Sequence, residues 1–110
     1  RQQMIDFIVA TAALDIELLR SLVTTEFIWS VPGRFDIYGP QILIQELSNH
    51  YNQVASLNIH SSITRGCLGS MHGIEILKTG KEIHFAHFFE FENHKKDAKL
   101  SKVTSYIVVD

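Results

Sequence analysis

The chain has 110 residues, of which 45% are hydrophobic and 20% charged, and a formal net charge of −2. That length supports one domain with a single core, and the composition is typical of a soluble globular protein. The charge balance argues against nucleic-acid binding, and no apolar run approaches the roughly 20 residues of a membrane span. We therefore treat residues 1–110 as one domain with no nucleic-acid or membrane partner.

The single cysteine, Cys67, excludes an internal disulfide. No signal-peptide pattern is visible, so we expect a protein of the reducing cytoplasm. No motif in the chain indicates a cofactor, and none is expected.

The first third of the chain predicts two helices and a strand. Residues 1–14 carry apolar side chains at helical spacing, with no Gly or Pro among them, and predict the first helix. Asp15 is the expected N-cap of a short second helix over residues 16–23. Residues 24–31 are β-branched and aromatic, which predicts a strand.

A loop and a third helix are expected next. The Pro-Gly pair at residues 32–33 ends the strand, and residues 34–38 predict a loop. Pro40 is tolerated in the first turn of a helix. Leu43, Leu47 and Tyr51 follow at four-residue spacing and predict the helix face that covers the sheet.

The second half of the chain predicts an antiparallel meander. Four segments of alternating apolar and polar residues, 57–64, 67–78, 82–92 and 100–109, are separated by turn signals. Three helices would close over one face of this curved sheet. The expected fold class is therefore an α+β cone.

The hairpin turns predict which side chains share a face of the meander. A two-residue loop at residues 79–80 would set His72 opposite His87, on a face made almost entirely of Ile, Leu and Phe. Polar groups on a covered face are hydrogen-bonded or line a cavity. The polar exceptions on this face, and hence the first functional candidates, are Ser61, Ser70, His72 and His87.

The opposite face of the meander is predicted to carry both polar and apolar side chains. Met71, Ala86 and Phe88 cluster there in this register, together with Glu75. We expect this face to pair two copies of the chain, in a homodimer that buries on the order of 1,000 Å² or more.

Several motifs recur in a familiar order along the chain. They are FIWSVPG at residues 27–33, then YGP at residues 38–40 with a helix after it, and later residues 79–83, 89–91, 99–103 and 106. Together they resemble the SnoaL-like branch of the nuclear transport factor 2-like superfamily, which includes ketosteroid isomerases and polyketide cyclases. The first two motifs resemble that branch's strand, loop and helix start, and the later ones resemble its final hairpins. The resemblance implies a cone with a small-molecule pocket on its concave side and often a homodimer through the other sheet face. It does not imply an activity.

Of the three catalytic positions of the ketosteroid isomerases, this chain has a suitable residue at one at most. The resemblance puts Ser30 at the position of the carboxylate base, Phe7 at that of the oxyanion-hole tyrosine and His87 at that of the oxyanion-hole aspartic acid. A serine without an activating base cannot abstract a proton next to a carbonyl, and a phenyl ring has no donor. Steroid isomerisation by that mechanism is not expected, yet His87 falls in the pocket by this argument too.

His72 and His87 keep three interpretations open. They could be core imidazoles that bond to each other, groups that bind a ligand, or an acid–base pair. No metal site is expected, because no carboxylate shares their face. The residues expected to line the pocket are Phe7, Trp29, Ser30, Tyr38, Leu47, Tyr51, Ile59, Ser61, Ser70, Phe85 and Phe89.

The first functional hypothesis is a binding module for a small, largely apolar molecule, because an apolar face with a few polar groups is typical of such sites. The second is an isomerase, cyclase or hydrolase that uses His87 or His72 in acid–base catalysis. The third is a structural dimeric domain with a vestigial pocket, for which a cavity below ~100 Å³ would be the sign.

Overall fold

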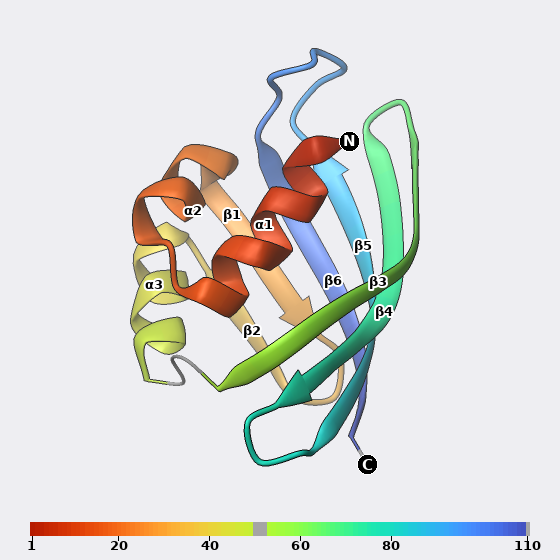
Figure 1. Ribbon diagram of the computed structural model, residues 1–110. Coiled ribbons are helices and arrows are strands. Elements are labelled where there is room, and N and C mark those ends of the chain that lie inside the picture. Colours follow the sequence, from red (N-terminus) through yellow and green to blue (C-terminus); the bar gives the residue numbers. More distant parts are fainter. Residues whose placement is uncertain (50–52, 110) are drawn as a thin grey trace.

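The computed structural model describes residues 1–49 and 53–109 (Figure 1). The sheet order is β2-β1-β6-β5-β4-β3, and every neighbouring pair is antiparallel except β1 and β6. The elements in chain order are α1 (Gln2–Ala13), α2 (Ile16–Leu22), β1 (Val23–Val31), β2 (Phe35–Tyr38), α3 (Pro40–Ser48), β3 (Val54–Arg65), β4 (Leu68–Leu77), β5 (Glu82–Phe91) and β6 (Leu100–Val109).

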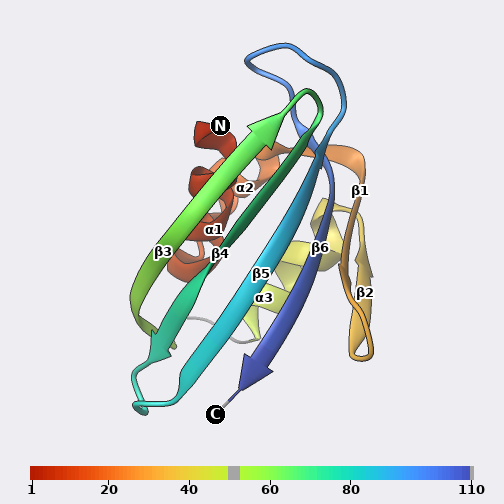
Figure 2. The same cartoon turned by 90° about the vertical axis from the view of Figure 1, so that its right-hand side faces the viewer.

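The three helices lie on the concave side of the sheet, which is strongly curved (Figure 1). Figure 2 shows the convex side of β3 to β6, with the helices behind the strands. This arrangement confirms the predicted α+β cone. None of the described helices is long and apolar enough to cross a membrane.

The first two helices confirm the sequence prediction closely. Leu14 ends α1 in the left-handed region, with φ of 57°. Asp15 then caps α2, since its carboxylate accepts a hydrogen bond from the backbone N–H of Leu18 at 3.3 Å. That bond satisfies one of the free N–H groups at the start of the helix.

The predicted loop at residues 34–38 is wrong, because Phe35–Tyr38 forms strand β2. It pairs with β1, with Val31 opposite Phe35 and Ile28 opposite Tyr38. The connecting turn includes Gly33 at φ of +80°, a conformation that glycine adopts without steric cost. Helix α3 begins at Pro40 as expected but ends at Ser48, and Tyr51 lies outside the described residues.

The predicted register of the β4–β5 hairpin is wrong by one residue. Leu77 donates its backbone N–H to the Lys81 carbonyl at 2.9 Å, and Gly80 donates back to Leu77 at 2.8 Å. The loop therefore has three residues and ends on Gly80 at φ of +90°, where only glycine is unstrained. As a consequence Met71, and not His72, lies opposite His87.

The slip exchanges the two faces of β4, because side chains alternate along a strand. Met71 and Glu75 lie on the concave side, where the sequence analysis had placed His72 and Ser70. In β3 an irregularity between Ile59 and Ser61 has a similar effect. Ile59 packs against the core as expected, whereas Ser61 is exposed on the convex side.

Two glycines let helix α1 and an aromatic ring approach β4 closely. A Cβ atom at Gly69 would overlap the sulfur of Met4, and one at Gly73 would overlap the backbone oxygen of Asn58 and meet the ring of Phe85 at 2.9 Å. Glycine within a strand is typical of such close approach. Around these contacts lies the core, whose central aromatic residue is Phe7, fully buried on α1.

Candidate functional site

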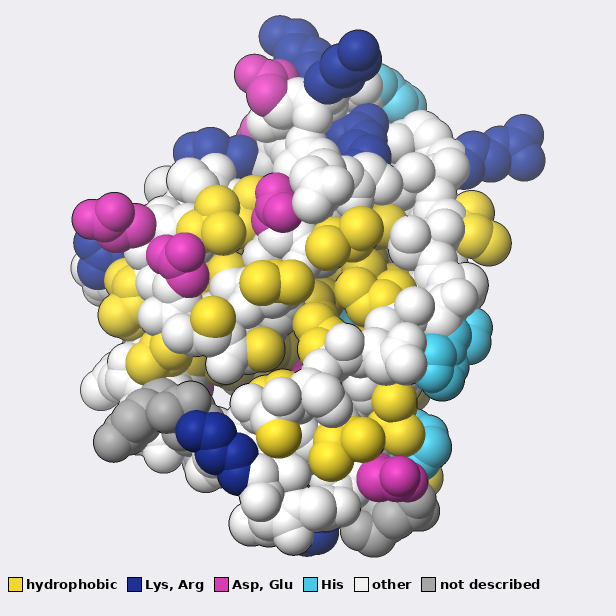
Figure 3. Space-filling model, viewed as in Figure 1, with side chains coloured by type: hydrophobic (Ala, Val, Ile, Leu, Met, Phe, Trp, Pro, Cys, Tyr) yellow, Lys and Arg dark blue, Asp and Glu magenta, His cyan; other side chains and the backbone are white. Residues whose placement is uncertain are grey.

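A cavity of about 280 Å³ lies between helix α3 and the β1–β2 hairpin. Its size is close to the lower end of small-molecule sites, which begin at about 300 Å³. The surface of this side is rich in hydrophobic side chains and is hollowed below α1 (Figure 3). The cavity is lined by Trp29, Phe35, Asp36, Ile37, Ile42, Glu46 and Leu47.

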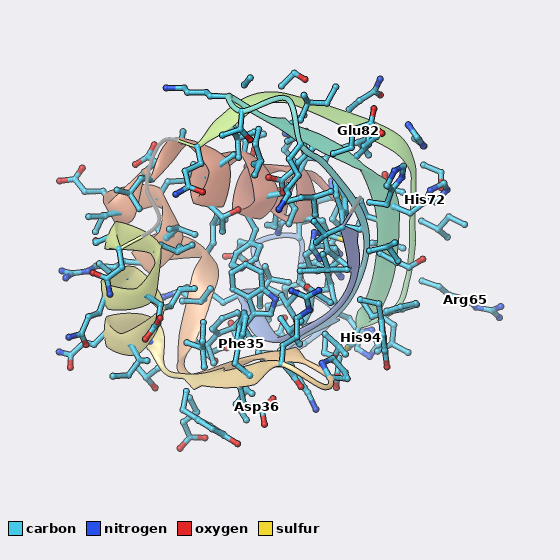
Figure 4. The ribbon with its side chains drawn as sticks, turned by 90° about the horizontal axis from the view of Figure 1, so that it is seen from below. Phe35, Asp36, Arg65, His72, Glu82 and His94 are labelled. Carbon is cyan, nitrogen blue, oxygen red and sulfur yellow. The ribbon has the colours of Figure 1, made fainter. Side chains whose placement is uncertain are left out.

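The β1–β2 hairpin supplies the aromatic part of the cavity wall. Figure 4 shows Phe35 on the inside of the curved sheet and Asp36 on its outside, as expected for neighbours on one strand. Trp29 and Ile37 face each other across the β1–β2 pair and share the concave side with Phe35. The wall on this side is therefore apolar, apart from the indole N–H.

A chain of two hydrogen bonds leads from this wall into the core. Trp29 Nε1–H donates to Ser105 Oγ at 2.7 Å, and Ser105 Oγ lies 2.6 Å from His87 Nδ1. Ser105 is fully buried and His87 is 4% exposed. The ring of Phe85 stacks on the imidazole with centroids 4.5 Å apart. His87 is thus held on one edge by a hydroxyl and on one face by a phenyl ring.

One ring nitrogen of His87 has a hydrogen-bond partner and the other has none. Ser105 Oγ accepts from Trp29 Nε1–H, and its contact with His87 Nδ1 can form with either group as the donor, because a hydroxyl has one hydrogen and two lone pairs. Nε2 is fully buried and has no hydrogen-bond partner among the described residues. The interior therefore contains one imidazole nitrogen that no described protein group satisfies.

Burial lowers the pKa of His87 from 6.5 to about 4. The charged imidazolium is poorly solvated in an apolar interior, so the ring stays neutral at pH 7. A group with such a pKa is a poor general acid near neutral pH, and its Nδ1 is already engaged by Ser105. The ring atom that His87 leaves for a further hydrogen bond is Nε2.

Glu75 is an interior residue that the sequence analysis had placed on the wrong face. It lies on the concave side of β4, opposite Leu57 on β3 and Ile83 on β5. Desolvation by burial raises the pKa of its carboxyl group, and no described residue forms a hydrogen bond or ion pair with it. The sequence did contain a signal for the orientation of Glu75, namely Gly69 and Gly73. Glycines within a strand are typical of a face that another part of the protein approaches closely, and Glu75 lies on the same face as these two.

The described candidate pocket residues fall into three groups in the structure: the concave interior with its cavity wall, the core, and the convex side. Trp29 and Leu47 lie on the cavity wall, and Phe85 and His87 face the concave interior. Ile59 and the two phenylalanines lie in or against the core, with the Phe7 and Phe89 rings 6.3 Å apart. The residues on or toward the convex side are Ser30, Tyr38, Ser61, Ser70 and His72.

His72 is the main correction to the candidate site. It lies on the outside of the sheet (Figure 4), opposite Ala86, with its ring 5.6 Å from that of His60. It therefore shares no face with His87, and the predicted imidazole pair does not exist. Within the described part of the chain no group of three or more His, Cys, Asp or Glu side chains is placed to hold a metal ion.

Comparison with known proteins finds matches in structure only. No family model and no curated protein sequence matches the chain. A nuclear transport factor 2-like protein of unknown function from Burkholderia xenovorans has a TM-score of 0.81 and 20% identity, covering 97% of this chain and 80% of that one. A candidate SnoaL-like polyketide cyclase from Shewanella denitrificans also has a TM-score of 0.81, with 17% identity over 97% and 88% of the two chains.

An LEH-like epoxide hydrolase from M. tuberculosis is similar as well, with a TM-score of 0.74 and 15% identity over 97% of this chain and 80% of that one. Proteins named for different activities thus share the fold, which by itself does not select among them. The chain has the cone-shaped α+β fold of the nuclear transport factor 2-like and SnoaL-like proteins.

Proposed function

We propose that this protein binds a small, largely apolar molecule in the cavity between α3 and the β1–β2 hairpin. The observation that carries the proposal is the volume of about 280 Å³ behind mostly apolar walls. Because an apolar cavity of ~150 Å³ admits benzene, this one has room for about 11 non-hydrogen atoms. A vestigial pocket would be smaller, below the ~100 Å³ expected for a purely structural domain.

Acid–base catalysis by histidine has less support than binding. His72 is exposed on the far side of the sheet, and the pKa of His87 is lowered to about 4 by burial. Neither residue lines the cavity, and a group with a pKa of about 4 is a poor general acid near pH 7. Binding needs no group that acts as an acid or a base. Burial of apolar surface supplies most of the affinity, and a few polar groups fix the orientation of the ligand.

The only tryptophan of the chain lies in the cavity wall and reports on binding. Acetophenone, with nine non-hydrogen atoms, should change Trp29 fluorescence saturably, with a Kd on the order of 1 mM or tighter. Leu47→Phe fills part of the cavity and should weaken binding. Val108→Phe is the matched control, because Val108 is 63% exposed on β6. No saturable change with acetophenone or with ethylbenzene would refute the proposal.

We further propose that two copies pair through the convex face of the sheet. Its exposed apolar side chains include Leu68, Phe88 and Tyr106, and the last two rings are 5.9 Å apart. Met71, which the sequence analysis had counted on this face, is buried on the other side. Phe88→Lys should lower the sedimenting mass to that of one chain, whereas Val9→Lys on α1 should leave it unchanged. A wild-type protein that sediments as a monomer at every concentration contradicts the pairing.

A further inference from the structure

We infer that the cavity selects cationic ligands, namely small apolar molecules that carry one ammonium group, and that Glu46 is the residue that recognises the charge. The inference rests on the proposed binding function and adds the chemical class of the ligand to it. Two charged residues line the cavity, Asp36 and Glu46, and both are acidic. None of the described lining residues is Lys, Arg or His.

Glu46 lies at the open end of the cavity. It lines the cavity from helix α3, one turn after Ile42, so both side chains lie on the same face of the helix. Glu46 is exposed, and Ile42 is 45% exposed. The carboxylate of Glu46 forms no hydrogen bond or ion pair with any described residue. It therefore remains available to a charged group of a ligand that occupies the cavity.

Asp36 adds negative charge beside the cavity without facing into it. Figure 4 shows its side chain on the outside of the curved sheet, whereas Phe35 lies on the inside. One carboxylate oxygen of Asp36 is 3.5 Å from the hydroxyl group of Tyr38. We therefore assign recognition of the cation to Glu46, and Asp36 contributes to the negative potential around the cavity.

The end of helix α3 is an unfavourable place for a carboxylate without a cationic partner. The helix ends at Ser48, so Glu46 lies in its last turn, where the helix dipole contributes a partial negative charge. Cationic side chains stabilise this end of a helix, and the last turn of α3 has none. A cation bound beside Glu46 would interact favourably with both the carboxylate and the carbonyl groups of the last turn.

The arrangement lets an ammonium group stay hydrated while the apolar part of the ligand is buried. An ion taken fully into an apolar cavity loses its hydration, and a single ion pair does not offset that loss. Beside the exposed Glu46 the ammonium group keeps water on its outer side, and the hydrocarbon part packs against Trp29 and Phe35. The faces of aromatic rings attract cations, so this wall does not oppose the charge.

Three probes that share a phenyl ring and differ in charge test the inference. They are phenethylammonium, 2-phenylethanol and phenylacetate, which are cationic, neutral and anionic at pH 7. Trp29 fluorescence at low ionic strength gives the Kd of each probe. From the strength of one ion pair exposed to water, wild type should bind phenethylammonium roughly 3- to 10-fold more tightly than 2-phenylethanol. Phenylacetate should bind most weakly.

The variant Glu46→Gln keeps the size of the side chain and removes its charge. Its affinities for phenethylammonium and 2-phenylethanol should agree within about 2-fold, because the ion pair is lost, and its affinity for 2-phenylethanol should equal that of wild type. Glu90→Gln is the matched control, since it removes the same charge from an exposed position on the convex side of β5. For wild type, about 1 M NaCl shortens the Debye length to about 3 Å and should also remove most of the preference.

The outcomes separate the inference from the proposed function. Equal affinity of wild type for the cationic and neutral probes, tightest binding of phenylacetate, or an undiminished preference in Glu46→Gln overturns the inference and leaves the proposed function standing. An equal loss of preference in Glu90→Gln also overturns it, because the effect would then reflect the net charge of the protein. Absence of saturable binding by all three probes refutes the proposed function, and the inference with it.

Discussion

The burial of His87 predicts that the protein loses stability as the pH falls below 6.5. The pKa of this residue is lowered by desolvation from 6.5 in the unfolded chain to about 4 in the folded state. Between pH 6.5 and about pH 4, His87 is protonated in the unfolded chain but stays neutral in the folded protein. The stabilising contribution is therefore complete above pH 6.5 and is lost as the pH falls through 4.

The magnitude follows from the difference between the two pKa values. At about 1.4 kcal/mol for each pH unit, the fall from 6.5 to about 4 corresponds to about 3 kcal/mol of unfolding free energy. Because His87 is only 4% exposed, solvent screening reduces this figure little. A loss of that size is a large fraction of the stability of an ordinary small domain.

Urea unfolding of wild type and His87→Phe between pH 7 and pH 4 measures this contribution. The phenyl ring keeps the stacking on Phe85, so the variant should fold and should lose about 3 kcal/mol less over this pH range. His72→Phe is the matched control, since it makes the same substitution at an exposed position on the convex face. Parallel profiles for wild type and His87→Phe would refute a neutral buried imidazole, as would an NMR titration of the His87 ring near pH 6.5.

Three further changes test the interior and the fold. Glu75→Gln should raise the melting temperature at pH 7 but not at pH 4. Burial raises the pKa of Glu75, so the ionised carboxylate destabilises the folded protein at pH 7, whereas the protonated carboxyl group at pH 4 does not. Equal shifts of the melting temperature at both pH values would contradict this. Leu43→Ala, at a fully buried position, should cost about 2–5 kcal/mol in urea unfolding, whereas Ile42→Ala, 45% exposed, should cost clearly less. Gly73→Ala should cost about 1–3 kcal/mol or more, since the added Cβ overlaps the backbone carbonyl oxygen of Asn58 and also meets the Phe85 ring, and a neutral effect in the same assay would contradict the close packing.

The order of elements and the fold class were predictable because they depend on strong local signals. Asp15 as a cap, Pro40 at a helix start and the alternation of four long segments each point to one structure. β2 was missed because its four residues carry little periodicity. It becomes a strand by pairing with β1, which is a tertiary effect.

The candidate site was harder to predict because it depends on register. Position 87 was placed correctly, since β5 alternates regularly through Phe85, His87 and Phe89. Position 72 was placed on the wrong face because the sequence Lys78-Thr79-Gly80 allows a two- or a three-residue loop, and a difference of one residue exchanges the faces of β4.

The relay from Trp29 through Ser105 to His87 could not be predicted from the sequence at all. Trp29 and Ser105 are 76 positions apart, and they meet only because β1 and β6 pair in parallel. No short-range pattern in a sequence signals such a contact. The volume of the cavity is likewise a property of the packed helices and strands.

The most direct test of the central claim is a two-dimensional ¹H–¹⁵N spectrum of the protein titrated with acetophenone. Binding in the cavity predicts a saturable shift of the Trp29 indole N–H signal, together with backbone signals of Ile37 and Leu47, while Tyr106 on the convex face stays unmoved. A spectrum in which the Trp29 signal does not move, or in which only convex-face signals move, would contradict the account.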